Sequence, residues 1–220
     1  MKRVPEPEVM DDPAQALAYA RADFAASNQR FVDRLREALP DPGAGTIVDL
    51  GCGPADIPIR LCRAWPAARV IGVDASPAML ALGREAVAAA GLSGRIELRE
   101  GRIPGLDLPA RAAAAVVSNS LLHHLPDPAV LWSEVQRLGA PGATVLVMDL
   151  FRPASVEEAR RIVAEAGSSD DPLLVRDFEA SLLAAFTLDE VRAQLAAAGL
   201  AALSSAIVSE RHLLVWGRLP

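Results

Sequence analysis

Lysine and runs of basic residues are scarce in this chain. Lys2 is the only lysine, and because alanine is abundant we interpret the use of arginine elsewhere as a bias in genomic composition. The 22 basic residues are outnumbered by 28 acidic ones, which gives a net charge of −6 and a pI near 5.1. No block of Lys and Arg offers a surface that could follow a nucleic-acid backbone. We therefore expect no nucleic-acid partner.

Cysteines and long apolar runs are also few. Cys52 and Cys62 are too few for a disulfide framework, and no cluster of His and Cys has the spacing of a zinc site. We predict free thiols in a reducing compartment and no bound metal. The N-terminus lacks the apolar stretch of a signal peptide, and no window approaches the ~20 apolar residues of a membrane span. These absences predict a soluble, cytoplasmic protein without a membrane partner.

The hydrophobic content is nevertheless high enough for one substantial core. Hydrophobic residues make up 51% of 220 positions, which favours a single domain. Strand-like runs alternate with helical patterns and are expected at residues 47–50, 69–74, 95–100, 114–119 and 143–150. The runs are almost continuously apolar, as expected where helices cover both faces of a parallel sheet. The pattern predicts a doubly wound α/β fold.

The N-terminal region is expected to lie outside this alternation. Residues 1–11 are predicted to be a loose tail. Asp12-Pro13 has the pattern of a helix start, and one apolar stripe at helical spacing continues to Leu39, before Pro40 and a DPGAG turn. We therefore divide the chain into a tail and lid helix, 1–40, and a domain at 41–220.

The C-terminal region contains an unusually long connection. Ser155-x-x-Glu158 and Thr187-x-x-Glu190 are capping-box patterns that predict helix starts. A standard connection has ~2–6 residues on each side of one helix, so residues 153–187 are too long for one. We expect them to form a helical cap over the substrate side of the sheet edge. The last two strand-like runs are separated by a short link that permits only an antiparallel pair.

A glycine-containing bend follows the first predicted strand. The sequence VDLGCGPAD places Gly51 and Gly53 where a tight turn exposes backbone N–H groups at a helix start. A glycine pair alone is a weak signal, because many α/β turns contain one. Asp74 ends the next predicted strand about 20 residues further on, where an acid can bind both hydroxyls of a ribose. The alternative is that Asp74 only caps the following helix.

Asp56 argues against a dinucleotide ligand. In the spacing Gly51-x-Gly53-x-x, it stands where a third glycine would allow the helix to pack close to a pyrophosphate. A carboxylate at this helix N-terminus would repel phosphate. A cationic or zwitterionic nucleoside suits the position better.

Four segments together resemble the class I S-adenosylmethionine-dependent methyltransferases. They are VDLGCGPAD, GVDASPAML, SNSLLHHLPDP and the terminal pair of strands. The most similar subgroup acts on small molecules and carries an LHHL-like segment after the fourth strand. The resemblance is dense over residues 46–152. It implies a Rossmann-like, doubly wound and mostly parallel sheet of seven strands, in which the last strand runs antiparallel.

The resemblance also assigns roles to residues at the strand ends. S-adenosyl-L-methionine is the implied cofactor, with Asp49 near its ammonium group and Asp74 at its ribose hydroxyls. Ser118 and Asn119 are placed beside the sulfonium and its methyl group. The implied cofactor-binding set is Asp49, Gly51, Gly53, Asp74, Ala75, Met79, Arg102, Ile103, Ser118 and Asn119.

Three positions depart from the family pattern. Ala55 replaces the usual third glycine, and Gly101-Arg102-Ile103 stands where an acid for the adenine amine is common. An acid at the start of the fourth strand is missing from ARAAAAVVSN. Adenine contacts are then expected from backbone groups. The missing acid is usually structural, so its loss does not predict an inactive protein.

His123, His124 and Asn119 are the candidate catalytic residues. An imidazole titrates near neutral pH, and methyl transfer to O–H or N–H must release a proton, so either histidine could act as general base. The alternative is that both histidines pack the loop, with Asp127 or backbone groups as hydrogen-bond partners. Alignment of nucleophile, methyl group and leaving sulfur would then be the main catalytic contribution.

Candidate substrate contacts come mostly from outside the motifs. The predicted set is Tyr19, Arg152, Phe178 and Phe186, with Asp177 and His212 as further candidates. Asp149 and Arg152 lie at the carboxyl end of the fifth strand, on the rim where open α/β sheets bind ligands, and a surface salt bridge is the alternative for Arg152. The helix that carries Tyr19 is expected to be a lid, with a plain packing helix as the alternative.

We therefore predict an enzyme that transfers the methyl group of S-adenosylmethionine to a small-molecule acceptor by in-line displacement. Two alternatives stay open. One is a nicotinamide-dependent oxidoreductase, and the other is an S-adenosylmethionine-binding protein that transfers no methyl group. The acceptor and the oligomeric state are not determined by these patterns.

Overall fold

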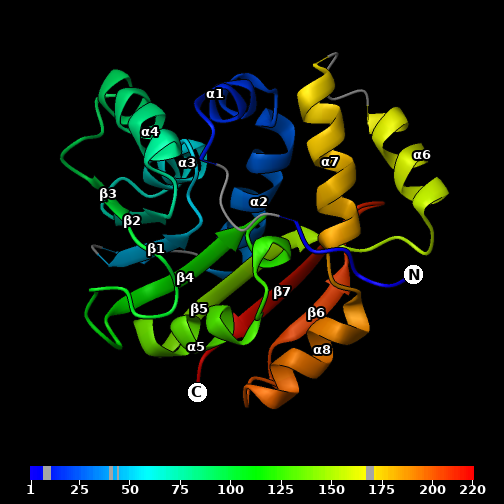
Figure 1. Cartoon of the computed structure of the whole chain (residues 1–220). Coiled ribbons are helices and arrows are strands. Elements are labelled where there is room, and N and C mark those ends of the chain that lie inside the picture. The colour runs from blue at the N-terminus through cyan, green and yellow to red at the C-terminus, as the bar shows by residue number, and fades with distance from the viewer. Residues whose placement is uncertain (7–10, 40–41, 44, 167–170) are drawn as a thin grey trace.

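A single seven-stranded sheet organises the molecule (Figure 1). The computed structural model describes residues 1–6, 11–39, 42–43, 45–166 and 171–220. Its strands are β1 (Thr46–Leu50), β2 (Arg69–Asp74), β3 (Ile96–Glu100), β4 (Ala113–Asn119), β5 (Gly139–Leu150), β6 (Ser204–Ile207) and β7 (His212–Arg218), in the spatial order β3-β2-β1-β4-β5-β7-β6. β7 pairs antiparallel with both β5 and β6, and the other pairs are parallel. The doubly wound fold and its antiparallel last strand are confirmed.

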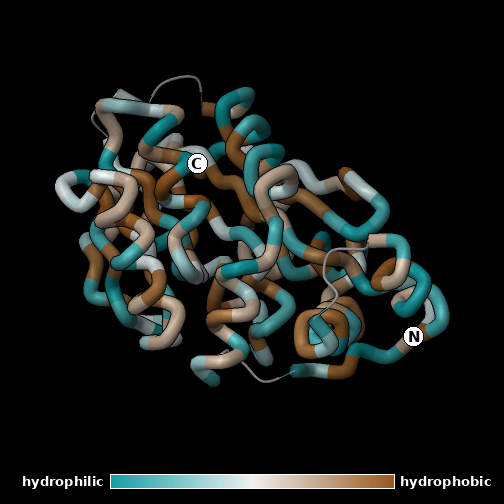
Figure 2. Tube along the Cα trace, turned by 90° about the horizontal axis from the view of Figure 1, so that it is seen from above, coloured by the Kyte–Doolittle hydropathy of each residue, from teal (hydrophilic) through white to brown (hydrophobic). Residues whose placement is uncertain are grey.

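Helices cover both faces of this sheet. They are α1 (Pro13–Arg21), α2 (Ala25–Ala38), α3 (Asp56–Ala64), α4 (Pro77–Ala89), the 3₁₀ turn η1 (Leu122–His124), α5 (Ala129–Leu138), α6 (Val156–Ala166), α7 (Pro172–Ala184) and α8 (Leu188–Ala197). Phe31 of α2 belongs to one buried cluster together with Ile47, whereas Trp132 of α5 belongs to another with Val48. Neighbouring strand residues thus face opposite layers. Figure 2 shows hydrophobic segments concentrated inside and hydrophilic ones outside.

The N-terminal region forms two helices, so the prediction of one continuous helix is wrong. Asp12 caps α1 as expected, because its side chain accepts hydrogen bonds from two backbone N–H groups of the first turn. The helix stops at Arg21, and α2 begins after Phe24. The two helices pack on different neighbours, α1 on α4 and α7, and α2 on α3. A single apolar stripe therefore does not describe them. The predicted DPGAG turn at residues 41–45 lies partly outside the described residues.

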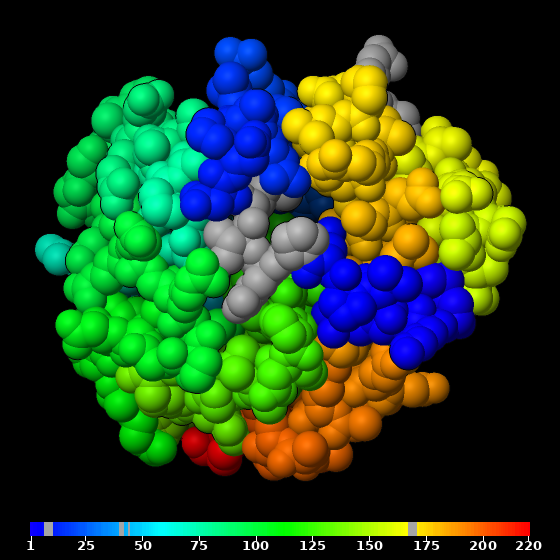
Figure 3. Space-filling view, in the orientation of Figure 1, coloured from blue at the N-terminus to red at the C-terminus, as the bar shows by residue number. Residues whose placement is uncertain are grey.

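The long connection after β5 contains two helices, α6 and α7, which pack against each other. The predicted helix end at Gly167 and most of the polar SSDD segment lie outside the described residues. Thr187 opens α8 with a complete capping box, as predicted. Residues 1–6 lie beside α7, where the N–H of Val4 donates to the carbonyl of Leu183 over 3.0 Å (Figure 3).

The strand directions determine where a ligand can bind. β1 to β5 end at one edge of the sheet, and the antiparallel β7 begins at that same edge, with His212 paired to Leu150. Open α/β sheets bind ligands at the carboxyl ends of their parallel strands. No helix among the described residues has the length and apolar character needed to cross a membrane.

Candidate active site

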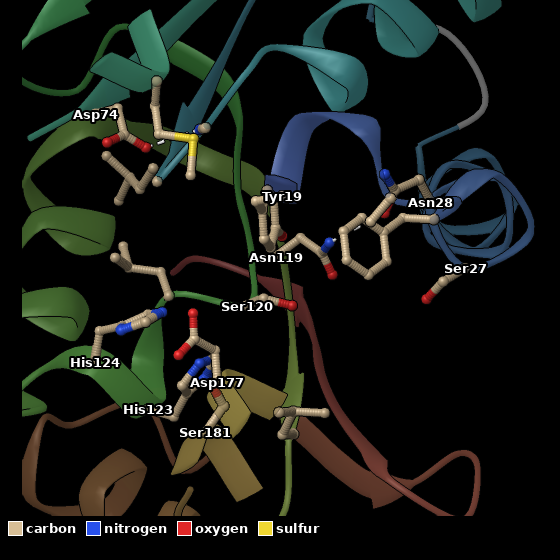
Figure 4. Close-up of a pocket in the computed structure, with 18 of the residues that line it drawn as sticks. Tyr19, Ser27, Asn28, Asp74, Asn119, Ser120, His123, His124, Asp177 and Ser181 are labelled. Carbon is tan, nitrogen blue, oxygen red and sulfur yellow. Dashed lines mark hydrogen bonds between the residues drawn. The ribbon is translucent and has the colours of Figure 1, made fainter. Parts of the chain in front are cut away.

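A cavity of about 310 Å³ opens at the carboxyl ends of the strands. One side, which we call the glycine end, is lined by Gly51, Gly53, Asp74, Ala75 and Met79. The opposite side, the histidine end, is lined by Arg30, Ser120, His123, His124, Asp177, Phe178, Ser181, Arg211 and His212. Figure 4 shows Asp74 on one side of the cavity, His123 and His124 on the other, and Asn119 between them.

The turn after β1 has a backbone that glycine adopts more easily than other residues. Gly51 and Gly53 have φ values of +76° and +51°. A Cβ atom at Gly51 would lie 2.9 Å from the Cβ of Leu121, so Gly51 is also required for packing. A Cβ at Gly53 would have no neighbouring atom within 4 Å, because this glycine faces the open cavity. A ligand can therefore approach the backbone closely at Gly53.

Asp74 holds this turn from the end of β2. Its Oδ2 accepts a hydrogen bond from the N–H of Gly53 over 2.8 Å, and its Oδ1 accepts one from the N–H of Ser76 over 2.9 Å. Burial raises the pKa of Asp74, and these backbone N–H groups oppose that rise. The helix α4 is capped by the Ser76 hydroxyl rather than by Asp74. Each carboxylate oxygen of Asp74 keeps a further acceptor position for a ligand.

The side-chain oxygens of two residues near the turn, Asp49 and Asn119, are buried and accept no hydrogen bond from the described residues. Asp49 is 1% exposed, and neither of its carboxylate oxygens has a hydrogen-bond partner among the described residues. Burial, with a contribution from the charge of Asp74, raises its pKa to about 8. The buried Oδ1 of Asn119 also has no such partner. Because buried polar atoms are nearly always satisfied, both sites suit a ligand that brings donors or positive charge.

His123 is held by the buried carboxylate of Asp149, a contact that the sequence patterns did not predict. Its Nδ1 lies 2.5 Å from Oδ1 of Asp149, a residue of β5 that also accepts the N–H of Leu122. Burial lowers the pKa of His123, but the charge and hydrogen bond of Asp149 outweigh it, and the pKa is raised. The predicted partner Asp127 instead accepts the N–H of Ala129 at the start of α5. The carboxylate beside His123 is thus that of Asp149 rather than Asp127.

Glu6 joins both histidines from the N-terminal segment. Its Oε1 lies 3.4 Å from Nε2 of His123 and 3.2 Å from Nδ1 of His124, and it accepts a hydrogen bond from the Ser181 hydroxyl. Burial raises the pKa of Glu6. These three residues bring one ligand atom each within 4.8 Å of one another, a spacing that could hold a metal ion. The absence of a metal stays a prediction. Residues 1–11 were predicted to be a loose tail, and nothing in their sequence indicated that Glu6 would contact the histidines.

Four predicted site residues do not line the cavity: Asp49, described above, and Ser118, Arg152 and Phe186. Ser118 is fully buried, and its hydroxyl donates to the carbonyl of Leu50. Arg152 forms an ion pair with Glu190 over 2.7 Å, so the salt-bridge alternative describes it. Phe186 lies in the main core, with the guanidinium of Arg3 above its ring at 4.0 Å. We therefore remove Arg152 and Phe186 from the candidate substrate contacts.

Other predicted residues are brought together at the cavity. Tyr19, Arg102, Ile103 and Phe178 line it along with the turn and the histidines. Burial raises the pKa of Tyr19 to about 12, so its hydroxyl stays protonated. Arg30, Ser120, Ser181 and Arg211 also line it and were not predicted. The positive φ of Ser120, +60°, is visible only in the folded chain.

Comparisons with known proteins agree with this geometry. Residues 47–143 match a family model described as a methyltransferase domain. The trans-aconitate 2-methyltransferase of Azoarcus sp. (strain BH72) is 36% identical over 128 residues, which cover 56% of this chain and 46% of that protein. The chain thus matches about half the length of such curated relatives.

Solved structures show the same fold. An S-adenosylmethionine-dependent methyltransferase of Aquifex aeolicus has a TM-score of 0.71 at 17% identity, with 95% of this chain and 99% of that chain covered. Phosphoethanolamine N-methyltransferase 2 of Haemonchus contortus, solved with S-adenosyl-L-methionine, has a TM-score of 0.68 at 16% identity, covering 89% and 43%. Residues 47–143 are thus similar to methyltransferase domains, and the chain has the fold of the class I S-adenosylmethionine-dependent methyltransferases.

Proposed function

We propose that the protein transfers the methyl group of S-adenosylmethionine to a small molecule by in-line displacement. The observation that carries the proposal is one continuous cavity, which joins the Gly53–Asp74 turn to the buried His123–Asp149 pair. The turn supplies a nucleoside-binding geometry, and the pair supplies a group that can hold a proton. A nicotinamide enzyme is disfavoured because Asp56 puts a carboxylate at the helix N-terminus.

The residues at the glycine end fit this cofactor. Asp74 is placed to accept hydrogen bonds from the ribose hydroxyls, and Asp49 carries a buried, unpaired carboxyl group that suits the methionine ammonium. Ala75 and Met79 would line the adenine, with Ile103 on the other side. Asn119 lies between the two ends, where its unpaired Oδ1 suits the positive sulfonium region.

The chain's own part in the chemistry is alignment and proton transfer. When bound, the cofactor supplies a methyl group that is already activated by the positive sulfur. The walls of the cavity hold the acceptor in line with that group, which is the main catalytic contribution expected of the protein. His123 in its neutral form takes the acceptor's proton, and Asp149 positions the imidazole. His124 shares Glu6 with His123 and is proposed to support the loop.

A small acceptor follows from how the cavity is covered. Asp177, Phe178 and Ser181 of α7 line it, and we propose that residues 153–187 form a cap over the domain at 41–220. Residues 1–40 would complete the cover, since Tyr19 also lines the cavity. The curated relatives are named for trans-aconitate, a small molecule. A cytoplasmic location and the absence of a nucleic-acid partner are part of this proposal.

Labelled-methyl transfer tests the proposal. The protein is incubated with methyl-labelled S-adenosylmethionine and fractions of a small-molecule extract, and products are followed by mass spectrometry. We expect label in a low-mass product together with S-adenosylhomocysteine, and loss of that product in His123→Gln. Cofactor binding without label in any fraction would instead support a binding protein that transfers no methyl group.

A further inference from the structure

Two arginines from distant parts of the chain face the histidine end of the cavity. Arg211 directly precedes β7, and because β7 is antiparallel, this position lies at the edge where the parallel strands end. Arg30 belongs to α2 and lines the same cavity. The two guanidinium groups are close enough for the charge of Arg30 to lower the pKa of Arg211, after the larger effect of burial.

Neither guanidinium group has an ion pair or a hydrogen bond with any residue that the structure describes. Two nearby arginines that do not line this end have partners: Arg34, one turn along α2, pairs with Glu37 over 3.1 Å, and Arg60 pairs with Asp56 over 2.6 Å. Arg211 is half-buried, and its guanidinium lies 5.6 Å from the centre of the Phe178 ring. The aromatic contact holds the side chain at the cavity without neutralising it.

The acidic residue next to Arg211 in the chain, Glu210, raises the pKa of Arg211 by its charge, but this effect is smaller than those of burial and Arg30, and Glu210 does not line the cavity. Burial, followed by the charge of Arg211, lowers the pKa of His212 to about 4, so His212 is neutral at physiological pH. Asp177 also lines the cavity, but its carboxylate is shared by Gln15 over 2.6 Å and by Arg176 over 2.7 Å. Arg211 is half-buried and Arg30 is exposed, so solvent screens part of the repulsion between the two like charges, and the remainder disfavours the empty site. A bound anion would remove that repulsion.

We propose that the acceptor is a small organic anion whose carboxylate or phosphate group binds between Arg211 and Arg30. The inference rests on the proposed methyl transfer and names the substrate class for it. A guanidinium group presents its N–H donors in a planar fork that matches the oxygens of either anion. The anionic group anchored there would leave another part of the molecule to reach Asn119 and His123. Neutral analogues would leave both charges uncompensated and would be rejected.

Calorimetry on the protein saturated with S-adenosylhomocysteine tests this binding site. The probes are trans-aconitate and citrate as carboxylates, inorganic phosphate, and the trimethyl esters of the two acids as neutral controls. We expect at least one anion to bind and both esters to fail. Arg211→Gln and Arg30→Gln should each weaken the binding of that anion by at least about tenfold, the effect of one charge-assisted hydrogen bond. Arg211→Lys keeps the positive charge but loses the planar set of N–H donors. It should therefore weaken anion binding less than Arg211→Gln does.

Arg34→Gln is the matched control, because it removes a charge from the same helix outside the cavity and should leave binding unchanged. Binding of a carboxylate but not phosphate, or the reverse, identifies the anion class. The proposal is overturned if no anion binds, if the esters bind equally well, or if Arg34→Gln weakens binding as much as Arg30→Gln. Failure of S-adenosylhomocysteine itself to bind would instead contradict the proposed function.

Discussion

The two ends of the cavity are built in different ways. The glycine end comes from strand ends and turns between Gly51 and Ile103, and its first turn depends on the positive φ values of Gly51 and Gly53. The histidine end combines side chains from residues far apart in the chain, including Glu6, Arg30, Ser181 and Arg211. The methyltransferase family model spans residues 47–143, which include the first end but not these four residues. The part common to many methyltransferases is therefore local, and the part that would select an acceptor is assembled by the fold.

The ends also differ in charge. The glycine end carries the half-buried carboxylate of Asp74, with the buried carboxyl group of Asp49 nearby, whereas Arg30 and Arg211 give the histidine end positive charge without an ion pair among the described residues. A cavity with this polarity suits a cationic cofactor on one side and an anionic acceptor on the other. Changes at one end should therefore alter one ligand and spare the other.

The largest expected effect is on turnover, from the histidine end. His123→Gln should lower the rate of methyl transfer by roughly 100-fold or more, because general-base catalysis contributes about 10²–10⁴-fold. The affinity for S-adenosylhomocysteine should stay unchanged. Since the pKa of His123 is raised, the wild-type rate should increase with pH through a value above 6.5 as the imidazole loses its proton.

His124→Gln is the matched control for this prediction, and stopped-time assays over a pH series provide the measurement. Its rate should fall much less and keep the same pH profile. Equal losses in both variants, or an unchanged profile in His123→Gln, would show that the histidine pair is structural.

The next effect concerns the cofactor and should come from the glycine end. Gly53→Val should weaken the binding of S-adenosylhomocysteine by about 100-fold, or ~2.7 kcal/mol, because a branched side chain would occupy the open space beside the turn. A residue with a side chain at φ +51° also costs about 1–2 kcal/mol of folding stability.

Gly91→Val separates these two consequences. Gly91 has φ +68° and open space around it but lies outside the cavity, after α4. Thermal unfolding should show similar losses of stability in the two variants, and calorimetry should show weakened binding only in Gly53→Val. A comparable loss of affinity in Gly91→Val would mean that strain, not the occupied space, causes the effect.

The smallest effect should be a pH dependence of cofactor binding. With a folded-state pKa of about 8, Asp49 is mostly neutral at pH 6, and a ligand ammonium would favour its ionised form. Binding should therefore release a proton, and affinity should rise by at most about tenfold per pH unit up to pH 8. Asp49→Asn should abolish the slope. Calorimetry in buffers of different ionisation enthalpy measures the number of protons released on binding. If Asp49→Asn kept the pH dependence of affinity, the proton would come from another group.

Asp49 also affects folding stability, with a definite sign. Its folded-state pKa lies above the ordinary value of 3.8, so the folded state holds the proton more tightly than the unfolded state. Stability should therefore fall as pH rises from about 4 towards 8, and Asp49→Asn should reduce this fall. Denaturation by urea over this pH range provides the measurement.

The sequence predicted the sheet and the glycine end well because their signals are local. Apolar strands, Gly51, Gly53 and Asp74 follow each other at short spacing, and each strand end adjoins the next in space. Both boundaries of β2 were predicted correctly. The apolar stripe at 13–39 failed because periodicity does not show that two short helices pack against different partners.

The histidine end could not be predicted in the same way. We expected Asp149 only on the rim at the end of its strand, and Glu6 in a loose tail, whereas the fold places both against His123. Arg152 and Phe186 had the right chemistry at the right strand end, but α8 and Arg3 provide them with structural partners. Chemical type alone does not distinguish a ligand contact from an internal pair.

Calorimetry with S-adenosylhomocysteine and with NAD tests the central claim, that the glycine end is an S-adenosylmethionine site. The wild-type protein should bind S-adenosylhomocysteine in the micromolar range and give no heat with NAD. Asp74→Ala should weaken binding by at least about tenfold, because each charge-assisted hydrogen bond contributes roughly 1.5–3 kcal/mol. Glu100→Ala, at the exposed end of the neighbouring strand β3, should have no effect. Heat with NAD and none with S-adenosylhomocysteine would contradict the account.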